Sequence, residues 1–84
     1  MVEKEIGVIA HYYSHIGVGI IELKDTLSVG DNIHIKGYSD DFTQTIESMQ
    51  IEHASVKEAK AGQAIGIKVT GKVHPNDKVF KIVA

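Results

Sequence analysis

The sequence predicts an all-β fold, a small closed antiparallel barrel of six strands with Greek-key-like connections. Six short runs rich in β-branched residues are separated by clusters of Gly, Asp, Asn and Ser, at the spacing typical of small sandwiches and barrels. The single stretch with a helical composition, residues 55–61, is too short to form a stable helix, so we expect a loop or one turn there. The 84 residues allow one domain, spanning residues 1–84.

The alternation of apolar and polar residues gives the positions of the expected strands. Ile33 and Ile35 alternate with polar neighbours, as do Ile65 and Ile67, and this period of two indicates one buried and one solvent-facing side. The two runs nearest the N-terminus are apolar on both parities, so we expect them to lie centrally or to cover a second apolar surface. The expected strands are residues 4–13, 16–24, 32–37, 43–53, 63–70 and 78–83.

The fourth of these runs changes phase in its middle. Ile46 has one parity, whereas Met49 and Ile51 have the other. A β-bulge near residues 47–49 would bring these three side chains to one face, and bulges allow the strands of small barrels to bend. With this register, the predicted core consists of Ile6, Val8, Val18, Ile20, Leu27, Val29, Ile33, Ile35, Ile46, Met49, Ile51, Ile65, Ile67, Val69 and Val79.

The composition argues against several classes of protein. The sequence has no cysteine, which excludes disulfides and thiolate metal sites. Its formal charge is −2, and it contains no Arg, the residue best suited to bidentate phosphate recognition, so we expect weak or no direct binding to nucleic acid. No apolar run is as long as a membrane span requires, and the first residues do not have the pattern of a signal peptide. We therefore expect no membrane partner and a cytoplasmic location.

Two motifs go beyond β patterning. An apolar-x-x-Gly-Asp turn, with Gly30 and Asp31, precedes the third expected strand. An Ala-Gly-x-x-apolar-Gly-apolar pattern, with Gly62 and Gly66, surrounds the start of the fifth. Glycine at such places permits a positive φ in a tight turn, a sharp start of a strand or the close approach of another backbone. We therefore predict a structural role in turns for these four residues, with a positive φ at Gly30.

Both motifs resemble the second, β-barrel domain of translation GTPases of the elongation factor Tu type, and their order along the chain agrees with it over nearly the whole length. In the place of a second Gly-Asp-like turn the chain carries Asn76 and Asp77. A still closer resemblance is to short, free-standing translation elongation factor-like proteins. Residues 42–49 are also similar to the small barrel at the end of some collagenase-like peptidases.

The resemblance implies a non-catalytic binding module in translation that recognises a protein or ribonucleoprotein partner through one rim of the barrel. The alternative is an interaction or assembly subunit that associates with itself or docks onto an enzyme such as a collagenase-like peptidase. The sequence contains neither a Gly-x-x-x-x-Gly-Lys-Ser/Thr phosphate loop nor a nucleophile elbow. We therefore expect no GTP binding, no enzymatic activity and no cofactor.

Residues 11–15 form the predicted partner-binding loop. Tyr12 and Tyr13 offer large, stiff contact surfaces, and the two flanking histidines add hydrogen-bonding groups at a connection between strands. The alternative is that one of the tyrosines only closes the end of the barrel. The predicted partner-binding set adds two outward-facing lysines and comprises His11, Tyr12, Tyr13, His15, Lys36 and Lys68.

No metal site is predicted. His11 and His15 have the spacing of a helical zinc pair, but on an extended strand these positions lie roughly 13 Å apart, too far to share one ion. Asp40 and Asp41 are interpreted as turn formers, because no graded series of oxygen ligands accompanies them. The remaining three histidines are interpreted as polar surface residues: His34, His53 and His74.

Overall fold

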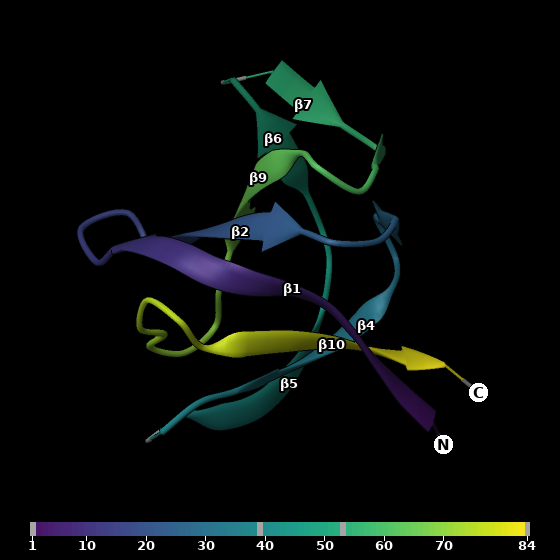
Figure 1. Cartoon of the computed structure of the whole chain (residues 1–84). Coiled ribbons are helices and arrows are strands. Elements are labelled where there is room, and N and C mark those ends of the chain that lie inside the picture. Colours follow the sequence, from purple (N-terminus) through teal and green to yellow (C-terminus); the bar gives the residue numbers. More distant parts are fainter. Residues whose placement is uncertain (1, 39, 53, 84) are drawn as a thin grey trace.

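The computed structural model describes residues 2–38, 40–52 and 54–83, and these residues form strands and turns without a helix (Figure 1). All strand pairings are antiparallel, which confirms the predicted all-β antiparallel fold class. In the described part of the chain, no helix could span a membrane. The strands are β1 (Val2–Tyr13), β2 (Val18–Leu23), β3 (Leu27–Ser28), β4 (Asn32–Lys36), β5 (Asp41–Thr45), β6 (Met49–Ile51), β7 (Ala54–Val56), β8 (Glu58–Ala59), β9 (Ala64–Lys68) and β10 (Lys78–Val83).

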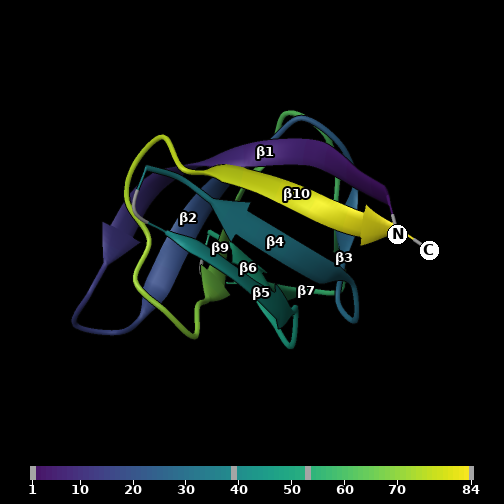
Figure 2. The same cartoon turned by 90° about the horizontal axis from the view of Figure 1, so that it is seen from below.

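Eight strands form one curled sheet in the order β5-β4-β10-β1-β2-β9-β6-β7, and β3 pairs with β8 separately. Figure 2 shows β1 and β10 along one side of the molecule, with β5, β6 and β9 below them. Among the described residues no backbone ladder joins the edge strands β5 and β7, so the sheet differs in detail from the expected continuous six-stranded barrel. A side chain instead joins β5 to the end of β9 and the segment after it. Gln44 on β5 donates to the Lys68 carbonyl (2.8 Å) and accepts from the Thr70 N–H (2.9 Å) beyond β9.

The run expected as one bulged strand is a crossover between two distant parts of the sheet. β5 pairs with β4, whereas β6 pairs with β9. Between them, Ile46 donates its N–H to the Asp31 carbonyl and accepts from the Gly30 N–H, each at 2.8 Å. Ile46 and Met49 are both buried, as predicted, because the crossover passes along the inside of the curled sheet.

The prediction of a loop or a single turn at residues 55–61 is wrong, because the chain there completes β7 and forms β8. β7 pairs with β6, and β8 pairs with β3. Both strands are so short that their own sequence gives almost no strand signal. They exist because neighbouring segments offer backbone partners.

Two irregularities in β1 change which of its side chains face the core. The pairing with β10 shifts between Glu5 and Gly7, and the pairing with β2 shifts between Ile9 and His11. Each additional residue reverses the side on which the following residues lie. As a result Ile6 and Ile9 are both buried, and the predicted burial of Val8 is wrong.

The predicted register of β2 is also wrong. Ile21 and Leu23 face the core, whereas Val18 and Ile20, which we expected to be buried, lie on the outer face and are only partly covered. Val29 is exposed at its turn, and Ile51 is half-buried against the core. The buried core consists of Ile6, Ile9, Ile21, Leu23, Leu27, Ile33, Ile35, Ile46, Met49, Ala59, Ile65, Ile67, Val69, Val73 and Val79.

Candidate functional site

The outer face of β2 forms a wall of an apolar groove of about 480 Å³. The β1–β2 hairpin projects on one side of it, and β9 and β6 lie on the other; all four strands are visible in Figure 1. The hairpin contributes its two most exposed apolar side chains, Ile16 (62% exposed) and Tyr13 (51% exposed). The apolar lining consists of Tyr13, Ile16, Val18, Ile20, Ala64, Ile65 and Gly66.

Gly66 lies at the base of this groove, where the lack of a side chain leaves space. It lies on β9 beside Ile20 of β2 and Gln50 of β6. A Cβ at this position would lie 3.4 Å from both Ile20 Cδ1 and Val18 Cγ1, tighter than most contacts of a real side chain. The atoms that approach Gly66 therefore belong to side chains of β2 and not, as was predicted, to another backbone, and a larger residue here would push them outward.

Two tight turns hold the sides of the groove. At the hairpin tip the N–H groups of Ile16 and Gly17 both donate to the Tyr13 carbonyl, at 3.2 and 2.9 Å, which fixes Ile16 in its exposed position. On the other side, Glu52 lines the groove with a φ of 50°, a left-handed conformation that is unfavourable for a residue with a side chain. Glu52 and Gln50 are the polar side chains of the lining.

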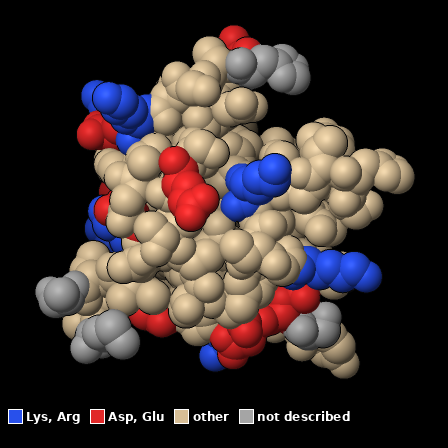
Figure 3. Space-filling view, turned by 180° about the vertical axis from the view of Figure 1, so that it is seen from behind, with Lys and Arg blue, Asp and Glu red and all other residues tan. Residues whose placement is uncertain are grey.

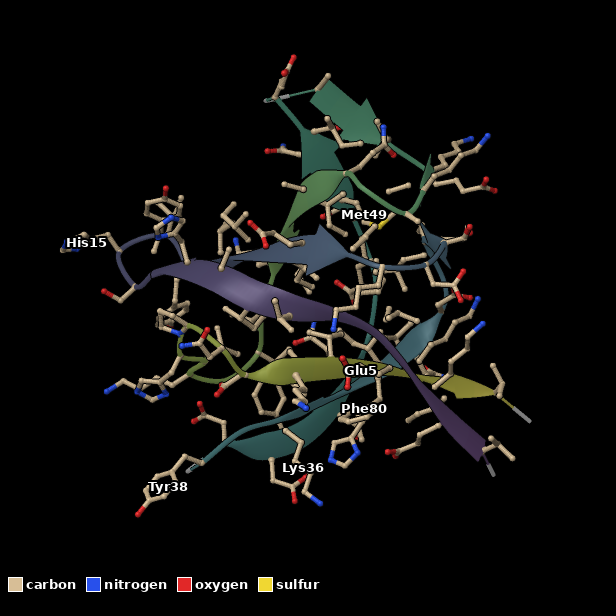
Figure 4. All side chains as sticks on the ribbon, in the orientation of Figure 1. Glu5, His15, Lys36, Tyr38, Met49 and Phe80 are labelled. Atoms are coloured by element: carbon tan, nitrogen blue, oxygen red, sulfur yellow. The ribbon has the colours of Figure 1, made fainter. Side chains whose placement is uncertain are left out.

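The structure divides the predicted partner-binding loop between two faces. Tyr13 lines the groove and its ring stacks with that of His11 at a centroid distance of 6.3 Å. His15 extends from the hairpin tip into solvent, as Figure 4 shows. Tyr12 packs against the core, which corresponds to the alternative in which a tyrosine closes the barrel end.

The two predicted lysines are far from each other in the sheet. Lys68 ends β9, pairs with Val18 of β2 and lies in a depression beside the groove. Lys36 ends β4, between β5 and β10, on the other side of the sheet (Figure 4). The structure therefore brings Lys68, but not Lys36, to the aromatic hairpin.

Sequence reasoning missed most of the apolar lining. Ile16 was assigned to a strand, and Val18 and Ile20 to the core. The available signal was the apolar character of both parities in this run, which we interpreted as central placement or as a second apolar surface. The second of these interpretations corresponds to the groove.

Charged side chains are sparse over much of the surface that contains the hairpin. In Figure 3, the view from behind, acidic side chains gather along the lower edge, and one acidic and one basic side chain lie near the middle. A basic side chain projects at the lower right, while uncharged atoms cover the upper right. Because the hairpin lies to the right in this view, a partner reaching it meets few competing charges.

A second cluster of polar residues joins two loops. Asp40 precedes β5, whereas His74 and Asp77 lie in the turn before β10, and one potential ligand atom from each lies within 4.8 Å of the others. His74 Nδ1 is 2.6 Å from Asp40 Oδ2, and the His74 N–H donates to Asp77 Oδ2 at 2.9 Å. Sequence reasoning did not find this cluster, because Asp40 is more than thirty positions away from His74 and Asp77 in the chain.

The charges in this cluster affect one another. The pKa of Asp40 is lowered, mainly by its hydrogen bond with Asp77 and to a smaller extent by its hydrogen bond with His74. Burial raises the pKa of Asp77, and the Asp40 carboxyl group raises it further. The hydrogen bond to Asp40 raises the pKa of His74. Two carboxyl groups therefore compete for the same proton beside an imidazole.

His34 also lies between two acids, although we expected a simple surface residue. Its Nδ1 is 2.8 Å from Glu3 Oε2, and its Nε2 contacts Asp41. The hydrogen bond to Asp41 raises the pKa of His34. Desolvation acts in the opposite direction, and the contact with Glu3 raises the pKa further. Its side chain thus connects β4 to both β5 and β1. His53 lies outside the described residues.

Comparison with known proteins points to peptidases. No protein-family model matches the chain. The chain is 36% identical over 77 residues to a protein of Methanocaldococcus jannaschii named as an uncharacterized protease, and 36% identical over 72 residues to a collagenase of Porphyromonas gingivalis. These matches cover 90% and 83% of the chain, but only 19% and 20% of the two relatives. The chain therefore spans about one fifth of the length of the curated relatives it matches.

Solved structures agree with this fold. The C-terminal domain of a Geobacillus thermoleovorans protein, named as a U32 peptidase, superimposes with a TM-score of 0.89 at 22% identity, covering 95% of this chain and 93% of that domain. A selenomethionine variant of the same domain gives a TM-score of 0.87 at 22% identity, with coverages of 90% and 96%. At this level of identity, the likeness shows the fold alone.

The predicted kinship with translation factors is wrong, and with it the predicted role in translation. The matched relatives are a protease and a collagenase, and the similar solved domains come from a peptidase. Gly30 and Gly62, which carried much of the resemblance, have φ values of 97° and 89°. Any fold with the same turns favours glycine at such positions, so these residues indicate turn geometry rather than family. The similarity of residues 42–49 to collagenase-like peptidases agrees with the comparisons.

Proposed function

We propose that this chain is a non-catalytic interaction domain that docks onto a collagenase-like peptidase through the apolar groove beside the β1–β2 hairpin. The observation that carries the proposal is the exposure of Ile16 and Tyr13 next to the apolar outer face of β2. The similarity to about one fifth of a protease and of a collagenase supports a peptidase as the partner.

The groove has the anatomy of a small protein contact site. Covering Ile16 or Tyr13 would remove a large apolar side chain from water, which contributes roughly 1.5–3 kcal/mol for a fully buried residue of this kind. Gln50 and Glu52 at the edge, with Lys68 nearby, offer polar groups that can orient a partner. An aromatic anchor with a polar rim is typical of the residues that dominate protein association.

The groove also suits contact better than chemistry. Among the described residues that line it, the polar groups are the Tyr13 hydroxyl, one amide and one carboxylate, without a histidine or lysine beside them. General acid–base catalysis or nucleophilic catalysis requires a second reacting group within hydrogen-bonding distance. We therefore assign peptide hydrolysis to the partner and substrate or domain positioning to this chain.

A binding measurement with two matched variants tests the proposal. The Methanocaldococcus jannaschii relative, produced without the segment that this chain matches, is titrated calorimetrically with the chain. We expect 1:1 binding that Ile16→Ser weakens at least tenfold. Tyr38→Ser is the control, because Tyr38 is fully exposed (106%) in the β4–β5 loop and does not line the groove. Circular dichroism verifies that both variants fold.

Two results would contradict the proposal. One is unchanged affinity of a folded Ile16→Ser variant. The other is an equal loss for Tyr38→Ser, which would show that any exposed apolar side chain contributes non-specifically.

A further inference from the structure

We propose that Asp40, His74 and Asp77 form a binding site for a divalent transition-metal ion, with Zn²⁺ as the best fit. Each aspartate would provide one carboxylate oxygen, and His74 would provide Nδ1. This site is separate from the docking groove, since the three residues belong to the β4–β5 and β9–β10 loops and none of them lines the groove.

The distances are suitable for a shared ion. Zinc binds imidazole nitrogen and carboxylate oxygen at about 2.0–2.2 Å, so its ligand atoms lie no more than about 4.4 Å from one another. The three candidate atoms already lie within 4.8 Å of one another, and small side-chain rotations would bring them within the limit for a shared zinc ion. His74 Nδ1 and Asp40 Oδ2, now 2.6 Å apart, would separate slightly as the ion takes the place of the proton between them. A water molecule would complete a tetrahedron.

The burial of the two carboxyl groups is the second observation that indicates a cation. Asp77 is only 4% exposed and the Asp40 side chain 9%. No lysine forms an ion pair with Asp77 among the described residues, and Lys72 acts on Asp40 only at longer range. The imidazole of His74 pairs with Asp40, but one positive charge does not balance two carboxylates that lose hydration and repel each other. A dication would neutralise both.

His74 provides an access route and defines the class of metal. Its side chain is 57% exposed, so an ion can reach the ligand atoms from solvent. An imidazole ligand favours zinc and other first-row transition metals, whereas Mg²⁺ and Ca²⁺ prefer sites made of oxygen alone.

The His34 cluster shows that the arrangement at His74 is specific. His34 also contacts two acids, but Glu3 meets Nδ1 and Asp41 meets Nε2. The ring therefore stands between these carboxylates, and they cannot share one ion with it. At His74, by contrast, one oxygen of each carboxyl group and one imidazole nitrogen all lie within 4.8 Å of one another.

Bound metal would join two loops that are distant in sequence. Asp40 closes the turn after β4, where its carbonyl accepts the Gly37 N–H at 2.7 Å. The turn at residues 74–77 is attached to β1, because the Asn76 N–H donates to the Ile9 carbonyl and the Asp77 carbonyl accepts the Ile9 N–H, each at 2.8 Å. The ion would thus connect three segments and stabilise the folded chain by mass action.

The experiment is a titration of the metal-free, full chain with ZnCl₂, followed by calorimetry and by NMR of the imidazole nitrogens. We expect one ion per chain and shifts confined to the imidazole nitrogens of His74, larger at Nδ1 than at Nε2. We also expect the unfolding temperature to rise by about 10 °C at a hundredfold excess of Zn²⁺ over its dissociation constant. Asp77→Asn and His74→Gln should each weaken binding at least tenfold.

Two matched controls separate this site from other acids and histidines. Asp31→Asn removes the carboxylate of an equivalent turn, and the double variant His11→Gln, His15→Gln removes exposed imidazoles. Both should bind Zn²⁺ as the original chain does.

Several outcomes would overturn the proposal. They are the absence of 1:1 binding, loss of binding in the His11 and His15 variant, preference for Mg²⁺ over Zn²⁺, or unchanged affinity in a folded Asp77→Asn variant. If the Asp77 and His74 variants do not fold, the NMR titration of the original chain decides alone. A shift at any histidine other than His74 then contradicts the assignment.

Discussion

The turn at residues 28–31 and the turn at residues 74–77 have the same hydrogen bonds. In each, the last residue is an aspartate whose N–H donates to the carbonyl of the first residue, at 3.1 Å in both turns. The aspartate side chain accepts the N–H of the first residue, at 2.9 Å in both turns. The third residue has a positive φ, 97° at Gly30 and 77° at Asn76. Locally, the two turns are equivalent.

Their surroundings differ in charge. Asp31 is partly exposed and forms an ion pair with Lys81 at 3.2 Å. Asp77 is buried and faces the Asp40 carboxyl group. The same local motif therefore places one aspartate beside a cation and the other beside an acid. The turn sequence therefore determines backbone geometry, whereas the packing of other segments determines whether its carboxylate meets a cation or another acid.

The largest expected difference between the turns follows from the space around them. A Cβ on Gly37 would lie 1.8 Å from Asp77 Oδ1, so Gly37→Ala must displace a buried carboxylate and should lower the free energy of unfolding by about 2–3 kcal/mol. Gly30→Ala meets no atom within 4 Å and should cost only the roughly 1–2 kcal/mol of its left-handed backbone. Urea denaturation measures both.

A double-mutant cycle sharpens this prediction. Adding Gly37→Ala to an Asp77→Ala variant should cost less than about 1 kcal/mol, because the clashing carboxylate is gone. Full additivity of the two changes would show that the contact between Gly37 and Asp77 is not the cause.

When no metal is present, removing the charge of the aspartate should change the free energy of unfolding in opposite directions in the two turns. Asp77→Asn keeps an oxygen for the His74 N–H and offers an N–H to Asp40, so we expect a gain in stability of up to about 1 kcal/mol at pH 7. Asp31→Asn loses the pairing with Lys81 and should cost up to about 1 kcal/mol. Thermal unfolding in the presence of a chelator measures the stability of both variants. If both variants gained stability, or both lost it, the proposed difference in charge between the two turns would be contradicted.

A smaller, pH-dependent effect is expected at His34, on the strand that follows the first turn. Contacts with Asp41 and Glu3 raise the pKa of His34, so its charged form stabilises the folded chain. That contribution is complete below the unfolded-state pKa of about 6.5 and is lost as the pH rises through the higher folded-state value. His34→Gln should therefore reduce stability by up to about 1 kcal/mol at pH 5.5 and less at pH 8.5. Urea titrations at the two pH values test the sign; a larger loss at pH 8.5 would contradict it.

The smallest effect is expected for Asn76→Gly. Asn76 has a φ of 77°, and both Asn and Gly accept this conformation, so the stability should change by less than about 0.5 kcal/mol. The change makes the two turns identical at their third position. A large loss would mean that the Asn76 side chain has a role beyond the turn.

Part of the fold and of the site could be predicted from the sequence. The strict alternation around Ile33, Ile35, Ile65 and Ile67 gave the correct buried face, because the strands β4 and β9 are regular. The positive φ at Gly30 was predicted correctly, since a turn requirement is local. Tyr13 was assigned to a binding surface and lies in the proposed groove, and this assignment stays a prediction until docking is measured.

The register of the first hairpin could not be predicted. Both parities of β2 are apolar, so the sequence does not distinguish Ile20, on the outer face, from Ile21, in the core. The two pairing shifts in β1 arise from its contacts with β10 and β2, which are distant in sequence or separated by a turn. A register that depends on two partners at once is not encoded in either strand alone.

The sequence by itself determined the all-β class and the tight turn at which Gly30 has a positive φ. These properties depend on interactions between residues a few positions apart. Only the tertiary structure decided which apolar side chains of β2 remain outside, and which acid each histidine meets. The adjacent residues Asp40 and Asp41 show this clearly, since one contacts His74 and the other His34. The physical reason is that charge and burial depend on what packs nearby in space, and neighbouring residues of a strand or turn point to opposite sides.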